Sequence, residues 1–482
     1  MGQLYSETPA LWSGTPWMYE DGATRHQPAD DPWGFLDYNP PAGARGLLLA
    51  ILLGCIGLAS YWGDATLARP LALFSQGMVA LLGVVLFVGV FTAGTPIVFT
   101  RECVLFGLFV VWIASSLFFV PRPEVTQLSL ITLVKLLGMA VIVLHAINGR
   151  SSYLWLLWAI VLVAIVASLG GWSGLARGAE TVMVGSRSHS RAMGTFGNPN
   201  GLSKLACLAT WAAIAIFFST RKPAIKGSMV ACCVFYLIVI GATGSRQAIV
   251  GYFLIMVVTY WFMIRKLSLN MSRKMLWLAA LCLVMVAAVA YLGTTAYWYR
   301  MALLIESVGG GEITEGSARG RLGLLRLSMQ AAWENPIFGL GYGNLRYWIG
   351  GFTSSRLGYR SAHNSIVGIA GETGFIGWSL FFGAWFLLLL RIRKADRLPL
   401  PRSERALLLS SWLLHVLMGL WSLMAQLELY KPFWALLAAN LGYVVWLERT
   451  YGQAGVDSHA SGDASGPEAV YPGQIHRWQE SG

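Results

Sequence analysis

Charged side chains are scarce in this sequence. They make up 12% of its 482 residues, whereas hydrophobic residues make up 56%. A soluble protein could not bury so much apolar surface, but a protein that crosses a bilayer repeatedly has no need to. The net charge of +12 does not favour nucleic acid as a partner, because basic residues beside membrane spans more often set their orientation. The composition predicts an all-α polytopic membrane protein.

Three sequence features are also absent, and each absence excludes a kind of site or segment. The six cysteines lie in or at the ends of hydrophobic spans without a C-x-x-C spacing, which excludes a disulfide framework and a cysteine zinc site. No Asp-x-Asp occurs in the loops expected on the outer side, so no metal site is predicted there. The first 30 residues lack a charged segment followed by an apolar one, and we therefore expect no cleaved signal peptide.

Long apolar runs dominate what is present. Runs of the length that crosses a bilayer predict about twelve spans: 46–62, 71–99, 103–120, 129–147, 153–170, 201–220, 228–242, 247–264, 275–293, 362–390, 406–424 and 431–449. Residues 1–45 and 451–482 are polar and rich in Pro, Gly, Ser or Asp, so we expect two disordered tails around one membrane domain, 46–450.

Basic residues in the short loops predict the orientation. Loops 265–274 and 391–405 are rich in Lys and Arg, as is the loop beginning at Arg221. With twelve spans these loops fall on one side, which would be cytoplasmic together with both tails. Two long segments, 171–200 and 294–361, then lie outside, and the second forms a large loop between spans nine and ten.

The segment 294–361 contains seven arginines and no lysine. Long loops translocate regardless of charge, so the arginines are compatible with an outer position. Two interpretations remain: a solvated basic face, or recognition of an anion. The exclusive use of Arg favours the second, because a guanidinium binds phosphate or carboxylate through a planar fork.

Within this segment, apolar positions from Arg319 to Trp333 repeat with helical spacing and predict an amphipathic helix along the membrane surface. Asn335-Pro336 ends it, and glycines at 339, 341 and 343 predict a flexible turn. The next span begins with His363 and Asn364, followed by glycines at every third position from Gly368 to Gly377. That spacing predicts one smooth small-residue stripe for close helix packing.

His363 is the main candidate for acid–base chemistry. A lone histidine is more often a packed or interfacial residue, but this one lies at a membrane edge beside the arginine-rich segment. A neutral imidazole there could accept a proton from a hydroxyl nucleophile. Further polar candidates occupy the expected outer ends of other spans: Arg246 after Gly244-Ser245, Arg191, and Asn200, which could instead be a helix cap. Lesser intramembrane candidates are Lys135, His145, Lys204 and Glu372.

Four motifs together resemble the O-antigen ligase and polymerase superfamily of bacterial envelope glycosyltransferases. They are Gly194-Thr195-Phe196-Gly197-Asn198-Pro199-Asn200, then Gly244-Ser245-Arg246, then Arg319-Gly320-Arg321 with Pro336 and Gly339-Leu340-Gly341, and finally His363-Asn364 with Gly374-Phe375-Ile376-Gly377. The resemblance covers about 46–450. Leu325 departs from the family pattern, which often has Trp there, and this affects only a packing inference.

The resemblance implies a GT-C-like fold in the bacterial inner membrane and a periplasmic active site. It implies inverting, metal-independent transfer of a glycan from undecaprenyl pyrophosphate, without a cofactor. His363 would activate the acceptor hydroxyl, while Arg246 and Arg321 would stabilise the leaving pyrophosphate. Arg191, Arg319, Asn200 and Asn364 would bind substrate.

The motifs leave the acceptor open. A ligase would use a hydroxyl of lipid A–core, and the His363 spacing and the form Asn198-Pro199-Asn200 favour this over a polymerase that joins repeat units. A transporter or flippase would more often show internal repeats and polar sites at the membrane midplane, whereas here the polar candidates gather at one face. A structural scaffold would not need the His and Arg residues.

Overall fold

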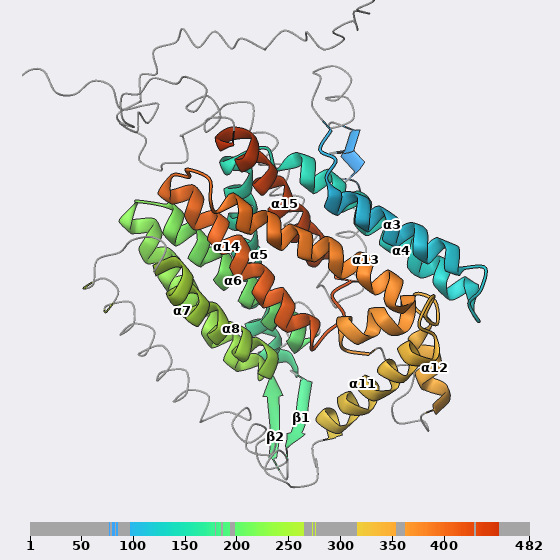
Figure 1. The fold of residues 1–482 in the computed structure, drawn as a ribbon. Coiled ribbons are helices and arrows are strands. Elements are labelled where there is room, and N and C mark those ends of the chain that lie inside the picture. Colours follow the sequence, from blue (N-terminus) through green and yellow to red (C-terminus); the bar gives the residue numbers. More distant parts are fainter. Residues whose placement is uncertain are drawn as a thin grey trace, which may run out of the picture. The chain divides into compact units, whose positions relative to one another are not determined.

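The computed structural model of the chain describes residues 97–178, 180–184, 187–192, 198–264, 316–352, 362–428 and 430–452, with single residues at 77–84, 272 and 275. These residues form a bundle of helices and one short β-hairpin (Figure 1). Both predicted tails, and the predicted spans 46–62, 71–99 and 275–293, lie wholly or mostly outside the described residues.

The other nine predicted spans each correspond to a helix. The helices are α3 (Arg101–Ser116), α4 (Pro123–Ala146), α5 (Arg150–Gly178), α6 (Pro199–Ser219), α7 (Pro223–Thr243), α8 (Arg246–Val258) with a π-helical extension η2 (Thr259–Ile264), α13 (Ser365–Ala395), α14 (Arg402–Ser422) and α15 (Lys431–Tyr451). Six of them, α4, α5, α6, α7, α13 and α14, are long and apolar enough to cross a bilayer. The chain is therefore a multi-pass membrane protein, while the total of twelve spans remains a prediction.

Helix ends follow from local sequence. Pro begins α4, α6, α7 and α15 at the first or second position, where its missing N–H costs no hydrogen bond. Asn198 caps α6 and Asn364 caps α13 through their side-chain oxygens. Helix α7 ends at Gly244, whose φ of 60° is left-handed, a conformation that glycine adopts without a Cβ penalty. This tight turn lets α8 begin at once.

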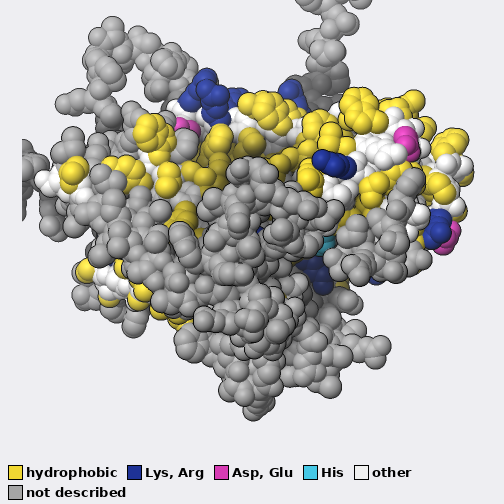
Figure 2. All heavy atoms as spheres, turned by 90° about the horizontal axis from the view of Figure 1, so that it is seen from below, with side chains coloured by type: hydrophobic (Ala, Val, Ile, Leu, Met, Phe, Trp, Pro, Cys, Tyr) yellow, Lys and Arg dark blue, Asp and Glu magenta, His cyan; other side chains and the backbone are white. Residues whose placement is uncertain are grey.

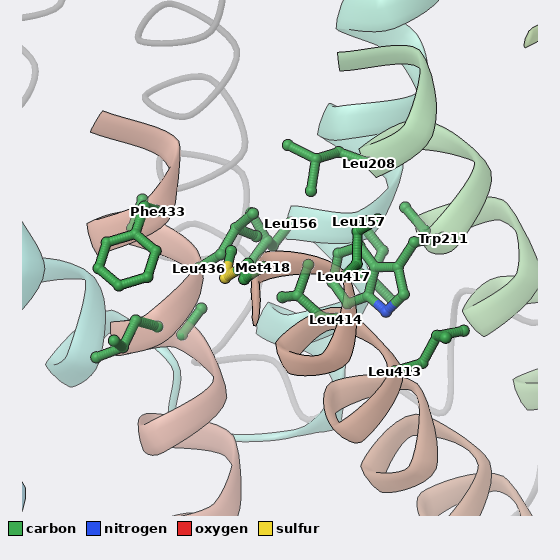
Figure 3. Close-up of a cluster of buried hydrophobic side chains, with 14 of the residues drawn as sticks. Leu156, Leu157, Leu208, Trp211, Leu413, Leu414, Leu417, Met418, Phe433 and Leu436 are labelled. Carbon is green, nitrogen blue, oxygen red and sulfur yellow. The ribbon is translucent and has the colours of Figure 1, made fainter. Parts of the chain in front are cut away.

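Helix α6 lies at the centre of the core, where its apolar side chains pack against α5, α8 and α14 (Figure 3). The indole of Trp211 donates to the Ser410 carbonyl at 2.6 Å and the Cys207 thiol to the Ala248 carbonyl at 3.2 Å. Each bond satisfies a polar group inside the apolar core. Helix α6 is therefore held on two sides, and its first turn has a fixed place.

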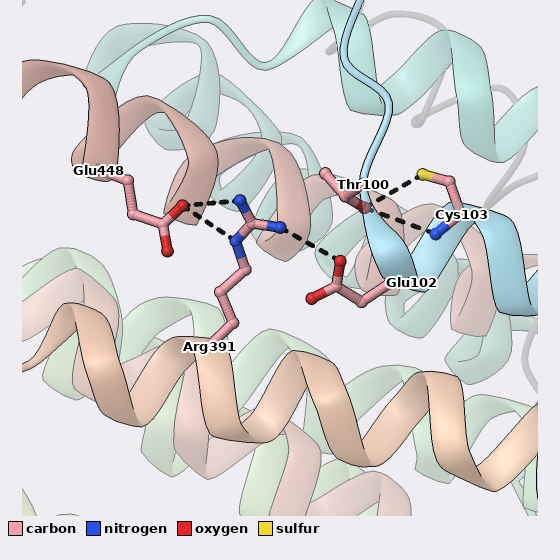
Figure 4. A network of polar contacts seen from close by, with 5 residues as sticks. All are labelled: Thr100, Glu102, Cys103, Arg391 and Glu448. Atoms are coloured by element: carbon pink, nitrogen blue, oxygen red, sulfur yellow. Dashed lines mark hydrogen bonds and ion pairs between the residues drawn. The ribbon is translucent and has the colours of Figure 1, made fainter.

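Ion pairs tie the helices together at one end of the bundle. Arg391 of α13 contacts Glu448 of α15 at 2.7 Å and Glu102 of α3 at 3.1 Å (Figure 4). Arg150 of α5 similarly contacts Glu404 of α14 at 3.3 Å. Both α13 and α15 finish near Arg391, so their first residues lie at the other end. We call that other end, where α6, α8, α13 and α15 begin, the site end.

The predicted smooth glycine stripe on α13 is wrong. Gly374 has φ 67° and ψ −177°, which interrupts the helix. A Cβ there would overlap the Ile337 carbonyl, so the chain before α13 occupies the notch that Gly374 leaves. Glycines at every third position are compatible with a straight helix or with a kinked one. In this protein the helix is kinked, because the backbone at Ile337 packs against Gly374.

One short β-hairpin accompanies the helices of the predicted all-α fold. Strands β1 (Glu180–Val184) and β2 (Arg187–Arg191) form an antiparallel hairpin in which Val182 pairs with His189. The intervening Gly185-Ser186 is a pair that favours tight hairpin turns. The rest of the described chain is helical and includes the two shorter helices α11 (Gly316–Glu334) and α12 (Leu345–Phe352).

Candidate active site

The connection between α14 and α15 meets the starts of three other helices. We call residues 423–430 the junction loop. Asn364, at the start of α13, donates from its side chain to the Leu423 carbonyl at 3.0 Å. Gln247, at the start of α8, donates to the Met424 carbonyl at 3.1 Å. On α6, the Lys204 ammonium lies 5.6 Å from the centre of the Tyr430 ring. The junction loop thus gathers the site end.

His363 lies directly before the cap of α13. It is exposed, and its φ of 50° is left-handed, a conformation that few residues other than Gly and Asn adopt easily. Asn364 fixes the position that follows: its Oδ1 accepts from the Val367 amide at 3.1 Å while its Nδ2 contacts Leu423. The imidazole is therefore carried by an anchored backbone, with its side chain facing outward.

Each end of the Asn364 side chain makes one hydrogen bond within the protein and keeps one further hydrogen-bonding position, so substrate binding by Asn364 stays a prediction. The next residue strengthens the anchor. The Ser365 hydroxyl donates to the Ala425 carbonyl at 2.8 Å and accepts from the Leu427 amide at 2.7 Å. Asn364 and Ser365 together anchor the backbone next to His363 to the junction loop.

Arg246 is the first residue of α8 and is half-buried. The turn at Gly244 places it at the site end, and the bond from its neighbour Gln247 to the junction loop fixes that turn. The start of a helix carries a partial positive charge, which favours anions. Arg246 thus lies where its positive charge and the partial positive charge of the helix start can attract the same anion.

Arg321 belongs to α11 and is also half-buried. Its guanidinium is close enough to Lys204 on α6 for the two positive charges to repel each other. The structure therefore brings Arg321 to the start of α6, although more than a hundred residues separate them in the sequence. Lys204, a lesser candidate in the sequence, is thus near enough to Arg321 for their charges to interact.

Helix α11 is held against α13 by the turn that follows it. The Leu340 amide donates to the Gly371 carbonyl at 2.9 Å, and the Phe375 amide to the Pro336 carbonyl at 2.8 Å. Gly339 has φ 65°, and a Cβ on it would overlap the Glu372 backbone. The predicted flexible turn is wrong: its glycines are needed for close packing, and the turn is bonded to the kink in α13.

The amphipathic prediction for α11 fits its exposure. Leu324, Ser328 and Ala331 face inward and are buried, whereas Met329 and Trp333 are exposed. Trp333 has 70% of its surface exposed, which is costly in water and favourable at a membrane interface. Helix α11 therefore presents a bundle face and an apolar outer face, as an interfacial helix does.

The remaining predicted substrate residues divide into two groups. Arg191 ends β2, and the adjoining Ala192 amide donates to the Ala242 carbonyl at 3.0 Å, close in sequence to Arg246. Arg319 lies in the first turn of α11. The side chains of both arginines lie outside the described part of the structure. Asn200 is half-buried in the first turn of α6, and the cap is Asn198, which accepts from the Asn200 amide at 2.9 Å.

Two lesser candidates are not at the site end. Lys135 is exposed on α4. His145 lies near the last residue of α4, where its ring accepts from the Val98 amide at 2.9 Å and contacts the Val141 carbonyl at 2.8 Å. The other end of α4 faces the turn before α12, because Asn344 donates to Thr126 at 2.9 Å. His145 is thus a satisfied structural histidine.

The sequence analysis missed a buried acid in the junction loop. Glu428 is fully buried, and neither of its carboxylate oxygens has a hydrogen-bond partner among the described residues. The nearby Ser365 hydroxyl donates to the Ala425 carbonyl and accepts from the Leu427 amide. Burial raises the pKa of Glu428 to about 7. An acid in a six-residue gap between two apolar spans is the signal that could have found it.

Two further buried groups surround this acid. Tyr342 and Glu372 are both close enough to Glu428 to interact with its charge. Burial raises the pKa of Tyr342, and the charges of Glu428 and then Glu372 raise it further. Within the described chain, no group of three His, Cys, Asp or Glu residues is arranged to hold a metal ion.

The surface at this end is mixed. In Figure 2 a histidine side chain lies beside basic side chains, and hydrophobic side chains cover much of the described surface around them. An open apolar groove of about 590 Å³ lies between α13 and α14. It reaches from Ile366 and Leu423, beside the Asn364 bond, to His415 and Leu389 within the helices. The groove thus joins the site end to the membrane-spanning region.

Comparison with known proteins identifies the family. The model of the O-antigen ligase family matches residues 203–382, and no curated protein sequence matches the chain. The matched segment begins in α6 and ends in α13, so it contains Lys204, Arg246, Arg321 and His363, whereas Arg191 and Asn200 lie before it. The match confirms the resemblance to the O-antigen ligase superfamily over residues 203–382.

Proposed function

We propose that this protein is an O-antigen ligase-type glycosyltransferase of the bacterial inner membrane. It would transfer a polysaccharide from undecaprenyl pyrophosphate to a hydroxyl of lipid A–core on the periplasmic face, without metal or cofactor. The observation that carries the proposal is the junction loop, which ties the residue after His363 and the residue after Arg246 to adjacent carbonyls, Leu423 and Met424.

The reaction requires a base and an anion site. The bonds of Asn364 and Gln247 to adjacent carbonyls support His363 and Arg246 in these two roles. The acceptor oxygen attacks the anomeric carbon and its proton passes to the His363 imidazole. The bond from this carbon to the pyrophosphate oxygen breaks, with inversion, and both bonding electrons leave on the pyrophosphate. Arg246 and Arg321 stabilise that charge as it develops.

The groove between α13 and α14 suits the lipid part of the donor. Its walls are formed mainly by apolar and aromatic side chains such as Trp378, Phe382 and Phe386. One end lies beside Asn364 and the junction loop, so a polyprenyl chain in the groove would present its pyrophosphate at the site end. A glycan, which is polar, would be excluded from such walls.

The orientation of the protein in the membrane is tested with single cysteines, each introduced into a variant from which the native cysteines have been removed. Gln330 on α11 and Arg397 between α13 and α14 are both exposed, so either would accept a thiol reagent. In cells with a permeabilised outer membrane, a membrane-impermeant reagent should label Gln330→Cys and not Arg397→Cys. The opposite pattern would place His363 in the cytoplasm and exclude the proposed function.

Acceptor choice is tested in purified protein with undecaprenyl-pyrophosphate-linked glycan. We expect the glycan to appear on lipid A–core. Growth of the lipid-linked glycan by added repeat units, with unmodified lipid A–core, would instead identify a polymerase of the same superfamily. Movement of the lipid-linked glycan across the bilayer without transfer would identify a flippase.

A further inference from the structure

Two arginine side chains share one aromatic ring where the start of α12 meets the start of α4. The Arg122 guanidinium lies 4.7 Å from the centre of the Tyr347 ring, and the Arg346 guanidinium lies 4.8 Å from the same centre. Arg346 also donates to the Tyr347 hydroxyl at 3.2 Å. Both arginines are exposed. We call these three residues the arginine–tyrosine cluster, and it joins two elements that are far apart in the sequence.

The backbone beneath the cluster is fixed by bonds and close packing. Asn344 donates from its side-chain amide to the Arg122 carbonyl at 3.3 Å and to the Thr126 hydroxyl at 2.9 Å. Gly343, with a φ of 88°, lies so close to α4 that a Cβ on it would overlap the Ser129 side chain. The start of α12 is therefore held against the first turns of α4, and the two guanidiniums are carried by anchored backbones.

The cluster lies at the edge of the membrane-spanning region. Arg122 directly precedes α4, which is long and apolar enough to cross a bilayer. Shortly before it, Phe118 and Phe119 have 86% and 69% of their surface exposed. The Phe119 ring stacks on Phe338 with centres 5.1 Å apart, so this apolar surface extends from the end of α3 to the turn after α11. Positive charge thus adjoins exposed apolar surface, as the binding of an anionic amphiphile requires.

The charges of the two arginines are not compensated by ion pairs within the described part of the chain. None of the ion pairs between described residues includes Arg122 or Arg346. Glu124 is exposed two residues after Arg122 and is not paired with it, and Glu372, on which the Arg346 charge acts, is buried in α13. Two guanidiniums against one ring repel each other. A phosphate bound by both would replace this repulsion with attraction.

We propose that Arg122, Arg346 and Tyr347 bind the phosphate headgroup of an anionic phospholipid in the leaflet at the site end. Guanidiniums bind phosphate oxygens through paired N–H groups, and the Tyr347 ring keeps the two guanidiniums together. The acyl chains of the lipid lie against Phe118 and Phe119. A glycerophospholipid fits this arrangement because its phosphate is joined to its acyl chains at the boundary between headgroups and hydrocarbon.

The bound lipid holds α12 at the membrane surface. Leu345 and Ile349 of α12 pack in the same apolar cluster as Ala362, which directly precedes His363. No residue of the arginine–tyrosine cluster lines the groove between α13 and α14, so the phospholipid site is separate from the one proposed for the polyprenyl chain. The inference does not depend on glycan transfer.

The test measures lipid binding by the full-length protein in detergent micelles. Phosphatidylglycerol, phosphatidylcholine with the same acyl chains, and inorganic phosphate are titrated separately. The proteins are wild type, Arg122→Gln, Arg346→Gln, the double variant and Phe118→Ser. Arg326→Gln is the matched control, because Arg326 is an exposed arginine on the neighbouring α11 and is not part of the cluster.

We expect the affinity for phosphatidylglycerol to fall about fivefold in each single arginine variant and about 30-fold in the double variant. Arg326→Gln should bind as wild type does. Phosphatidylcholine carries a compensating positive charge and inorganic phosphate lacks acyl chains, so both should bind wild type much more weakly. Phe118→Ser should weaken the binding of phosphatidylglycerol and leave that of inorganic phosphate unchanged.

Wild-type affinity for phosphatidylglycerol in the double variant would overturn the inference. Inorganic phosphate that binds as tightly as phosphatidylglycerol would identify a free-anion site, and undecaprenyl phosphate that displaces phosphatidylglycerol at equal concentration would identify a substrate site. Either result would reject the phospholipid. If the double variant fails to insert, the two single variants are judged by the same criterion. Failure of these as well would show that the arginines are structural and reject a binding role.

Discussion

Asn364 and Leu423 are joined by a hydrogen bond of 3.0 Å between the side-chain amide of one and the backbone carbonyl of the other. The bond connects the first residue before α13 with the first residue after α14. His363 precedes Asn364, so the position of the proposed base depends on a contact 59 residues away in the sequence. A residue that caps a helix here also sets the geometry of the site.

Asn364→Asp separates these two roles. A carboxylate can still accept from the Val367 amide and cap α13, but it cannot donate to Leu423 and would repel that carbonyl. We expect a normally inserted protein with kcat lowered about 10- to 100-fold, as for a displaced catalytic group. Asn198→Asp is the matched control, because Asn198 caps α6 by accepting from the Asn200 amide and has no bond to the junction loop among the described residues. Equal activity in the two variants would contradict a positioning role for Asn364.

His363→Asn removes the proposed base and keeps a residue that tolerates the left-handed backbone at φ 50°. A placed base typically contributes about 10²–10⁴-fold, and because pyrophosphate leaves easily we expect a loss of at least about tenfold. Wild-type kcat should fall at acidic pH, where histidine becomes protonated, and the residual activity of the variant should lack this fall. A variant as fast as wild type across pH 5.5–8.5 would show that His363 is no base.

Arg321→Lys tests whether the planar guanidinium matters. Lysine keeps the positive charge but loses the fork that binds two phosphate oxygens at once, so transfer should fall by at least about tenfold, and further in Arg321→Ala. The control is Arg326→Lys on the same helix, at an exposed position. If Arg321→Lys and Arg326→Lys transfer glycan at the same rate, Arg321 is a surface arginine without a role in binding.

Glu428 should make stability depend on pH. Burial raises its pKa from 4.5 to about 7, so the folded state holds its proton over a range in which the unfolded state has lost it. The stabilisation is complete below about pH 4.5 and is lost as pH rises to about 7, by roughly 3 kcal/mol over the interval. The thermal unfolding midpoint of the wild-type protein should therefore decrease as the pH is raised from 5 to 7.

Glu428→Gln should remove this part of the pH dependence, because the amide stays neutral throughout. The difference between the two midpoints, measured from pH 5 to 9, should grow up to about pH 7 and then stay constant. Glu334→Gln is the control, since Glu334 is exposed and accepts from Gln330 on the same helix. Parallel curves for wild type and Glu428→Gln would mean that Glu428 is already ionised in the folded protein.

Local patterns in the sequence predicted much of the fold. Apolar runs located nine of the described helices, and the edge position of His363-Asn364 was recognised because a polar pair interrupts such a run. The kink at Gly374 could not be found this way. It depends on the Ile337 carbonyl filling the space beside a glycine, which is a contact between segments and leaves no mark on the local hydropathy.

The site was predicted less completely for the same reason. Residue type, position and the family resemblance predict Arg246, Arg321 and His363 as site residues, whereas no local pattern predicts the junction loop that gathers the helix starts. Its contacts are made largely through backbone carbonyls such as Leu423 and Met424, and any residue supplies a carbonyl. The charge interaction of Lys204 with Arg321 likewise joins residues that are more than a hundred positions apart in the sequence.

The apolar groove provides a test of the lipid part of the donor. Gly419 lines it, and a Cβ added there meets no atom within 4 Å, so Gly419→Leu should fill the groove without displacing a neighbour. We expect KM for a long polyprenyl-pyrophosphate donor to rise about tenfold, while a donor with a short prenyl chain is affected much less. The reason is that only the long chain needs the full groove.

Gly107→Leu on α3 is the matched control, because its added Cβ also meets no atom within 4 Å and the position does not line the groove. It should leave KM for both donors unchanged. Thermal unfolding should be similar in the two variants, since each adds an apolar side chain to open space on a helix of the bundle. If Gly419→Leu uses the long donor as well as Gly107→Leu does, the polyprenyl chain lies elsewhere, and the groove between α13 and α14 is a packing feature of the bundle.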